Sequence, residues 1–381
     1  MSLETEFLPW LISFATILVV VLLDKWENRY IKSILDWFPA ILFAYVIPAL
    51  ISKFGGFDFS ENAIHGISKD YLIPLAIVTV MSSLSISQLK AMGWKPIAVF
   101  VAGSLWIALF PVAYIGLTFD SELVQGLFAE QQFWKGLPPV VGGWIGGSTS
   151  QLVLKELVEC PENIFLSILI LDNILVNIWT ILMFQGIKRT DLLNFRLCIS
   201  DNKKPESLDM DQKSTLHPIF VVFVLLILVL LVNMFTSSLV VKIILLSIMG
   251  LILRNFIKKW PFNFILKFGS ILIITVMAIL GLKLKFDLVQ IHGPLLWFLI
   301  VWLVSHFFFM LLAAKILNIN AVWVPIASMA NVGGIATAPA VTAAYEKKWM
   351  PHAILLAVLS MATGTFWGML TIFLLQGLFQ G

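Results

Sequence analysis

Two glycine-rich, hydroxyl-rich segments interrupt the apolar runs of this chain and restrict how it can fold. The first is residues 142–151, GGWIGGSTSQ, and the second is residues 328–337, SMANVGGIAT. Because unpaired peptide groups are costly in hydrocarbon, such backbone must be enclosed by protein or line a polar cavity. Two segments of this kind in matching halves of a chain are typical of transporters.

The composition requires a membrane environment. Of the 381 residues, 60% are hydrophobic and 12% charged, and the mean hydropathy is +0.96, which leaves too little polar surface for a soluble globule. The net charge of +3 is small and the basic residues are scattered over loops, so nucleic acid is not an expected partner. Two cysteines are too few for a disulfide framework or a thiolate metal cluster.

The apolar runs predict about ten full membrane spans. They cover residues 8–23, 33–52, 71–88, 96–119, 163–187, 218–235, 238–257, 262–282, 294–316 and 352–380. Two glycine-rich segments, 136–157 and 324–345, are additional, and we predict that they are broken or re-entrant helices. Acidic Glu4 and Glu6 stand where a signal peptide would carry lysines, so the first run is expected to be a retained helix.

The distribution of basic residues indicates the topology. If both glycine-rich segments cross the membrane, the 25 Lys and Arg residues divide between the two sides without bias. If each segment dips in and returns, and the N-terminus is outside, most of them are cytoplasmic, as the positive-inside rule favours. Each half then has an odd number of crossings, which would make the halves inverted repeats. The rule does not distinguish a re-entrant hairpin from a broken crossing helix.

Short matches between the halves support an internal duplication. The halves are 1–187 and 218–381, and residues 188–217 form the polar linker, which we expect to be a solvated cytoplasmic loop. We expect the protein in a bacterial inner membrane. The matching pairs keep their order and approximate spacing: Thr79-Val80-Met81 with Thr275-Val276-Met277, Gly146-Gly147 with Gly333-Gly334, Pro161 with Pro351, and Gln185-Gly186 with Gln376-Gly377.

One carboxylate, Asp172, lies well inside a predicted span. An acid at that depth usually faces an ion or substrate path, although it can also cap a broken neighbouring helix. Asn173 and Asn177 add donors and acceptors on one helix face. The hydroxyls and amides beside the glycines suit sodium, and half-helix N-termini suit an anion, whereas close helix packing is the alternative role of the glycines.

These residues form the predicted site. The cation-binding set is Asp172, which would ligate sodium, with Asn173, Gly146, Ser148, Gly333 and Thr337. The substrate-binding set is Gly147, Thr149, Ser150, Gln151, Asn331, Gly334 and Asn177.

Other motifs do not point to catalysis. There is no GxxxxGK[ST], HExxH or GxSxG pattern, and a single carboxylate without a partner is a poor catalytic set, so an enzyme is not expected. We expect no cofactor, and sodium as the coupling ion. His306 could carry protons, but a lone intramembrane histidine more often forms hydrogen bonds between helices.

The paired motifs resemble those of a known family. Gly146-Gly147-Ser148 followed by Leu171-Asp172-Asn173, and Ala330-Asn331-Val332-Gly333-Gly334 with Thr337 and Ala338, look like the uncharacterised YjcL-like membrane proteins, grouped as a domain of unknown function. That family is similar to the cation:proton antiporter and anion transporter superfamily, which includes bile-acid, glutamate and citrate sodium symporters. The resemblance implies inverted repeats, a panel domain, and a core domain that moves like an elevator around two broken helices.

The resemblance places Asp172-Asn173 where the antiporters have an acidic pair, and here the second member is Asn. The leading prediction is therefore a secondary active transporter, a sodium-coupled symporter of a small anionic organic solute. A cation:proton antiporter without organic substrate and a non-transporting membrane subunit that anchors a partner are the alternatives. The superfamily analogy also suggests a homodimer in the lipid bilayer.

Overall fold

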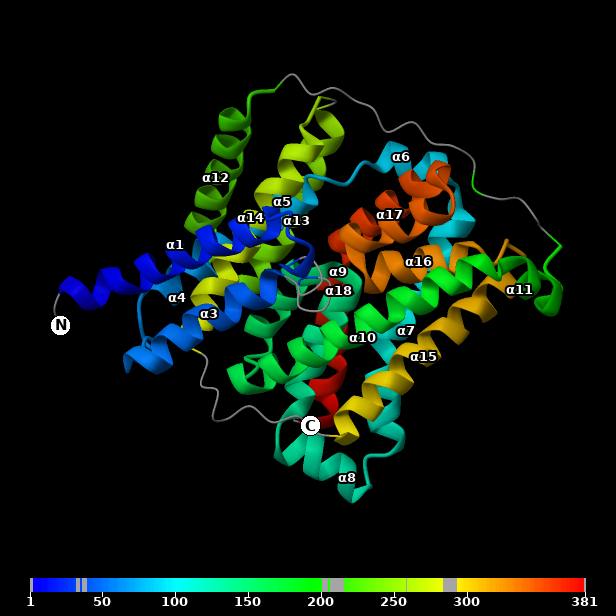
Figure 1. Cartoon of the computed structure of the whole chain (residues 1–381), viewed down its shortest axis with the longest axis horizontal. Coiled ribbons are helices and arrows are strands. Elements are labelled where there is room, and N and C mark those ends of the chain that lie inside the picture. Colours follow the sequence, from blue (N-terminus) through cyan, green and yellow to red (C-terminus); the bar gives the residue numbers. More distant parts are fainter. Residues whose placement is uncertain are drawn as a thin grey trace. The chain divides into compact units, whose positions relative to one another are not determined.

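A computed structural model describes residues 3–31, 35, 40–200, 205, 216–257, 259–283 and 293–379 (Figure 1). Over these residues all regular structure is helical, and seven helices are long and apolar enough to cross a membrane. Two shorter apolar helices lie at Phe7–Leu23 and Phe43–Gly55. The chain is thus an all-helical membrane protein, as its composition predicts.

Most helices begin and end within a few residues of the predicted apolar runs. For example, α12 begins at Pro218, where the His217 side chain accepts a hydrogen bond from the Ile219 amide. Proline suits the first turn of a helix. The amide hydrogen that it lacks would have no hydrogen-bond partner within the helix at that position. The matching helices are α1 (Leu3–Lys25), α7 (Trp94–Leu117), α10 (Glu162–Lys188), α12 (Pro218–Phe235), α13 (Leu239–Phe256), α14 (Phe262–Gly281), α15 (Gly293–Ile316) and α18 (Met350–Phe379).

The predicted span 71–88 is wrong at both ends. Its helix begins earlier, as α4 (Ile64–Ile67) and the π-helical turn η1 (Ser68–Leu72) lead directly into α5 (Ile73–Met81). It ends at Met81, because the hydroxyls of Ser82 and Ser83 donate to the carbonyls of Thr79 and Val80 and satisfy the last turn. A separate helix, α6 (Ile86–Met92), follows.

The structure also differs from the prediction at the end of the run 33–52 and in the linker. The run 33–52 starts largely outside the described residues, and its helix α3 (Ala40–Gly55) continues three residues further than predicted. The linker, predicted as a solvated loop, begins with the helix α11 (Thr190–Leu197), so the loop prediction is wrong there. Residues 201–204 and 206–215 of the linker lie outside the described residues.

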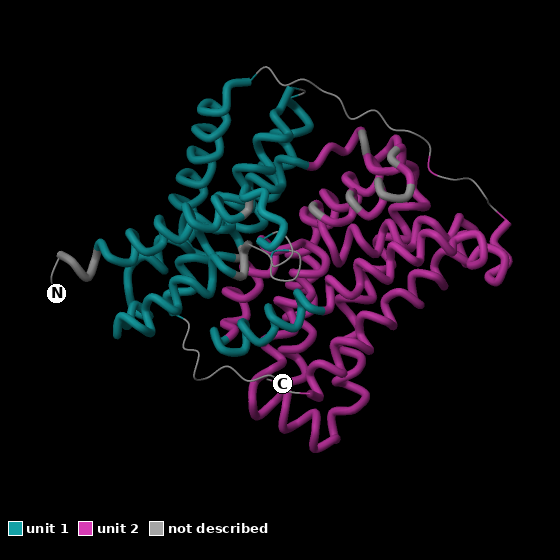
Figure 2. Tube along the Cα trace, viewed as in Figure 1, with its two compact units in different colours: residues 1–83, 161–174, 213–290 teal, residues 84–160, 175–212, 291–381 magenta. Residues whose placement is uncertain are grey.

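The chain forms two compact units that each combine segments from both halves (Figure 2). Unit 1 consists of residues 1–83, 161–174 and 213–290, and unit 2 of residues 84–160, 175–212 and 291–381. The two compact units therefore do not coincide with the two halves that the internal sequence matches predict. Helix α10 contributes residues to both units.

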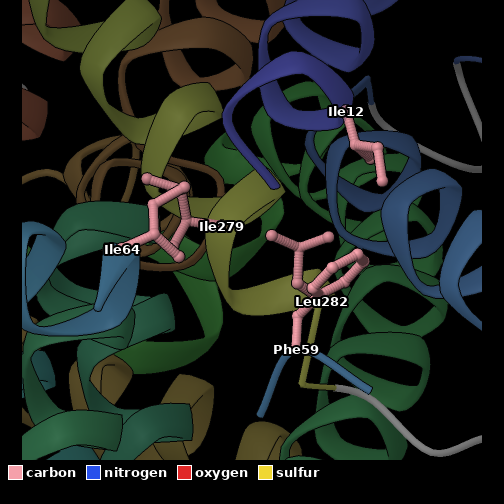
Figure 3. Close-up of a cluster of buried hydrophobic side chains, with 5 residues drawn as sticks. All are labelled: Ile12, Phe59, Ile64, Ile279 and Leu282. Carbon is pink, nitrogen blue, oxygen red and sulfur yellow. The ribbon is translucent and has the colours of Figure 1, made fainter. Parts of the chain in front are cut away.

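In unit 1, α14 packs against α1, α3 and α5, and α12 and α13 pack against α5. A hydrophobic cluster forms where α1, α4, the end of α14 and the loop at Phe59 come together (Figure 3). Burying such side chains contributes about 1.5–3 kcal/mol each relative to leaving them exposed. The cluster residues are Ile12, Phe59, Ile64, Ile279 and Leu282.

Glycines allow the helices of unit 1 to approach closely. A side chain on Gly281 would overlap the carbonyl of Tyr45, so α14 and α3 touch backbone to backbone there. Tyr45 is fully buried, and its hydroxyl donates to a Glu162 carboxylate oxygen at 2.5 Å. A β-carbon built on Gly250 of α13 would likewise lie 2.8 Å from the carbonyl oxygen of Val78. Small residues at these crossings serve packing.

In unit 2, α18 packs against α9 (Leu137–Leu157), α7, α16 (Trp323–Val332) and α17 (Gly334–Tyr345). α7 also packs against α15, and their interface is strongly aromatic, with stacked pairs such as Trp106 with Phe309. Buried aromatic pairs of this kind rigidify a helix pair. The glycine-rich segments therefore sit among long helices of the same unit.

Gly281→Ala should destabilise the protein. The added methyl group overlaps the Tyr45 carbonyl, and overpacking of this kind costs about 1–3 kcal/mol. Thermal unfolding of the purified protein measures the effect. Gly66→Ala in α4, where nothing lies within 4 Å of the added β-carbon, is the control and should unfold close to wild type. Equal unfolding temperatures for both variants would contradict the close crossing of α3 and α14.

Candidate functional site

The first glycine-rich segment is a helix interrupted at Gly147. This residue has φ 68° and ψ −166° inside α9, which is otherwise helical from Leu137 to Leu157. Glycine is essentially the only residue that adopts this backbone conformation. The prediction of a broken helix is confirmed here.

The second segment breaks at the equivalent position. Helix α16 ends at Val332 and α17 begins at Gly334, which has φ 62°. In both segments the second glycine of a Gly-Gly pair has the left-handed backbone. The sequence match between Gly146-Gly147 and Gly333-Gly334 therefore corresponds to a positive φ at the second glycine of each pair.

The first glycine of each pair has a different role from the second. The space where a side chain of Gly146 would lie is filled by the hydroxyl side chain of Ser150, and that of Gly333 by Thr337, in each case four residues later. Thr337 Oγ1 also donates to the Gly333 carbonyl at 2.5 Å. By contrast, nothing lies within 4 Å of a β-carbon built on Gly147 or Gly334. The first glycine of each pair therefore makes room for a neighbouring side chain. The second glycine interrupts the helix, and the space beside it is open.

A hydroxyl of α18 connects the two interrupted helices. Ser360 Oγ donates to the carbonyl of Ile145, two residues before the break in α9, and lies 3.5 Å from Asn331 Oδ1, two residues before Gly333. Ser104 of α7 donates to the same Asn331 oxygen at 3.0 Å. Peptide groups near an interruption need such partners when water is excluded.

Helix α18 follows α9 on both sides of the break. A side chain on Gly364 would overlap the backbone of Gly146, and one on Gly368 would overlap Leu154. Between them, Thr365 Oγ1 donates to Ser150 Oγ at 3.0 Å. The interrupted shape of α9 is thus held by a complementary surface of small and hydroxyl residues.

Beside these contacts lies a fully buried histidine. His306 Nδ1 is 3.2 Å from the Gly103 carbonyl, and Nε2 is 3.2 Å from Ser328 Oγ, which accepts from Trp179 Nε1 at 2.9 Å. Because a carbonyl only accepts, Nδ1 carries the proton, and a neutral ring then accepts from Ser328. A β-carbon on Gly103 would lie 2.8 Å from His306 Cε1 and 2.9 Å from Asn331 Nδ2, so these two side chains converge there.

His306 therefore forms hydrogen bonds between α15, α7 and α16, which supports the structural interpretation of this residue. Its proton-carrier role stays a prediction. The polar groups of the site are carbonyls, hydroxyls, amides and one imidazole. Among the described residues, no three His, Cys, Asp or Glu side chains gather as a metal site. Carbonyl and hydroxyl oxygens suit a hard cation such as sodium.

The other predicted site residues lie along two helices. Ser148 is half-buried, and Thr149 and Gln151 are buried in α9. Thr149 Oγ1 has no hydrogen-bond partner among the described residues. In α10, Asn177 is half-buried and belongs to unit 2.

Asp172 and Asn173 belong to the part of α10 that lies in unit 1. Asp172 is buried, with 9% of its surface exposed, and Asn173 donates its amide hydrogen to the Leu169 carbonyl of its own helix at 2.7 Å. The glycine pairs belong to unit 2. The predicted sharing of one ion between Asp172 and the glycine segments stays a prediction.

Sequence reasoning missed Ser104, Trp179, Ser360 and Thr365, and it did not assign Ser328 to the site although Ser328 begins the second glycine-rich segment. A single hydroxyl in an apolar run gives little signal by itself. The four-residue spacing of Ser360, Gly364 and Gly368 was an available signal, since small residues at this spacing mark a close helix crossing.

Ser360→Ala should lower the free energy of unfolding by about 1–3 kcal/mol, because the Ile145 carbonyl loses its α18 partner in a buried place. Thr363→Ala is the matched control. Thr363 is also a hydroxyl residue of α18, but it bonds the Leu359 carbonyl of its own helix, so its loss should cost less. Thermal unfolding in detergent compares them. A Ser360 variant as stable as the Thr363 variant would contradict the proposed link.

The chain was compared with known proteins. A family model described as "Protein of unknown function (DUF819)" matches residues 11–378. No curated protein and no solved structure matches the chain significantly. Because the match covers nearly the whole chain, the protein belongs to the DUF819 family.

Proposed function

We propose that this protein is a secondary active transporter that couples sodium to the transport of a small anionic organic solute. The observation that carries the proposal is the pair of interrupted helices in unit 2, with open space beside Gly147 and Gly334. Interrupted helices enclosed by protein are the usual ion and substrate sites of secondary transporters.

The open space favours binding over packing. A glycine kept for close packing has a neighbour where its side chain would be, as Gly146, Gly364 and Gly368 do. Gly147 and Gly334 have none within 4 Å, although both are only partly exposed and the helices that carry them pack against α18. A subunit that only anchors a partner would have no need for such unfilled space, so the anchoring alternative is less well supported.

The chemistry at the first break suits an ion or a charged solute. The second part of α9 begins after Gly147, and its first amides belong to a helix N-terminus, which favours negative charge. The buried Thr149 hydroxyl without a partner is a ready ligand there. The carbonyl ends of α16 and of the first part of α9 favour a cation. Sodium and an anionic group could thus bind at the same pair of breaks.

The order of the helices supports inverted repeats. The first repeat would contain α1, α3, α5, α7, α9 and α10, and the second α12, α13, α14, α15, the α16–α17 pair and α18. The two interrupted elements occupy the same place in this order, and each has its positive φ at the second glycine. We also propose that the two halves have opposite orientations in the membrane.

The interleaved units fit a moving carrier. In this proposal unit 2, which contains both breaks, forms the transporting core together with the whole of α10, which carries Asp172, and the rest of unit 1 is the panel. The core would move like an elevator past the panel. The same arrangement is implied by the resemblance to the superfamily of cation:proton antiporters and anion transporters, and that relation is part of the proposal.

The function can be tested in proteoliposomes with a sodium-sensitive dye and a pH dye inside. A panel of small carboxylates and other organic anions is added outside in the presence of sodium. A sodium signal that depends on one solute supports symport. Sodium-driven alkalinisation or acidification without any solute would instead support the cation:proton antiporter. If neither signal appears with any solute, the transporter proposal is contradicted.

Asp172→Asn should abolish the stabilisation of the purified protein by sodium. Sodium at a hundred times its dissociation constant should raise the wild-type free energy of unfolding by about 2.7 kcal/mol. Removing a buried carboxylate that ligates the ion removes this gain. Asp120→Asn, an exposed acid beyond the end of α7, should keep it. An unchanged sodium effect in Asp172→Asn would exclude Asp172 as a ligand.

A further inference from the structure

Helix α11 has a surface that the transport proposal does not use. It starts two residues after α10 ends at Lys188, and Figure 1 shows it at the end of that long helix. Since α10 is long and apolar enough to cross a membrane, its end lies near the lipid headgroups. At eight residues α11 is too short to cross the membrane.

One side of α11 is fixed to the connection between α15 and α16. The buried Asn194 donates to Asn320 Oδ1 at 3.1 Å and accepts from the Ala321 amide at 2.7 Å. Just after the helix, the Ser200 amide donates to Asn318 Oδ1 at 2.9 Å, and Asn318 donates back to Ser200 Oγ at 2.8 Å. The side chains of α11 and its C-terminal end therefore hold the residues that lead into α16, the first part of the second interrupted helix.

The other side of α11 exposes two large apolar side chains. Leu192 is 48% exposed and Phe195 82% exposed, and their three-residue spacing places them on one stripe. Arg189, the residue that precedes the first turn, and Arg196, in the last turn, are both exposed, as is the acidic Asp191 in the first turn. Exposed Leu and Phe side chains with arginines close by are found in helices that lie in the membrane interface.

We propose that α11 is a membrane-surface helix that binds anionic phospholipid headgroups. Arg189 and Arg196 pair with the lipid phosphates, and Leu192 and Phe195 insert at the acyl boundary. Charge complementarity and continuity with the end of α10 identify the occupant as lipid. Because α11 also holds the start of α16, lipid binding stabilises the entry to the second interrupted helix.

The test uses the full chain in nanodiscs of phosphatidylcholine, with or without phosphatidylglycerol. Of the two cysteines, Cys198 is exposed at the end of α11 and Cys160 is buried, so Cys198 can be spin-labelled without adding a cysteine. Accessibility to oxygen and to a nickel chelate then reports the depth of the label. Thermal unfolding in the same nanodiscs reports the effect of the lipid.

The proposal expects a label at interfacial depth, and an unfolding temperature several degrees higher with phosphatidylglycerol. The double variant Arg189→Gln/Arg196→Gln should lose most of that increase, whereas Lys25→Gln/Lys267→Gln, which removes the same charge from exposed positions in unit 1, should retain it. A label fully accessible to the nickel chelate would overturn the proposal. The proposal would also be overturned if both double variants lost the same part of the increase in unfolding temperature. The same holds if free inorganic phosphate raised the unfolding temperature equally in nanodiscs of phosphatidylcholine alone.

Discussion

Inside a membrane, the peptide groups at an interrupted helix must find partners in the protein. This requirement governs how unit 2 is built. The hydroxyl of Ser360 donates to the Ile145 carbonyl beside the break in α9 and lies close to Asn331 before the break in α16. Ser104 donates to Asn331 from α7, and Thr365 donates to Ser150. Without such groups the breaks would cost several kcal/mol each, and straight helices would be more stable.

The two glycines of each pair divide two tasks that a single residue could not perform. The first lets a hydroxyl four residues later fold back over the backbone, at Gly146 with Ser150 and at Gly333 with Thr337. The second takes a backbone conformation that favours glycine and leaves the neighbouring space open. Packing holds the break in place, and the open space beside it is where we propose that an ion or solute binds. The carrier that we propose would need both, because its ion site must be rigid in shape yet accessible from one side at a time.

The sequence predicted the helices and the places of the interruptions well, because both depend on local properties. Apolar runs set the ends of α12 and α14, and Gly-Gly pairs can take positive φ wherever they occur. Local patterns failed at Met81, where two serine side chains end α5, and at α11, whose sequence looks like a solvated loop. Ser104 and Ser360 were missed because the role of a serine hydroxyl depends on the group that it faces in the folded protein, which the local sequence does not show. The interleaving of the halves in two units likewise depends on long-range packing.

In the proposed carrier, Gly147 and Gly334 break two helices beside space that holds an ion or solute. An experimental structure in nanodiscs, determined with sodium and again with sodium replaced by a large organic cation, tests it most directly. We expect both helices to be broken at these glycines in each state, with density beside them in sodium alone. Continuous helices through both glycine pairs, with their polar side chains toward lipid, would contradict the account.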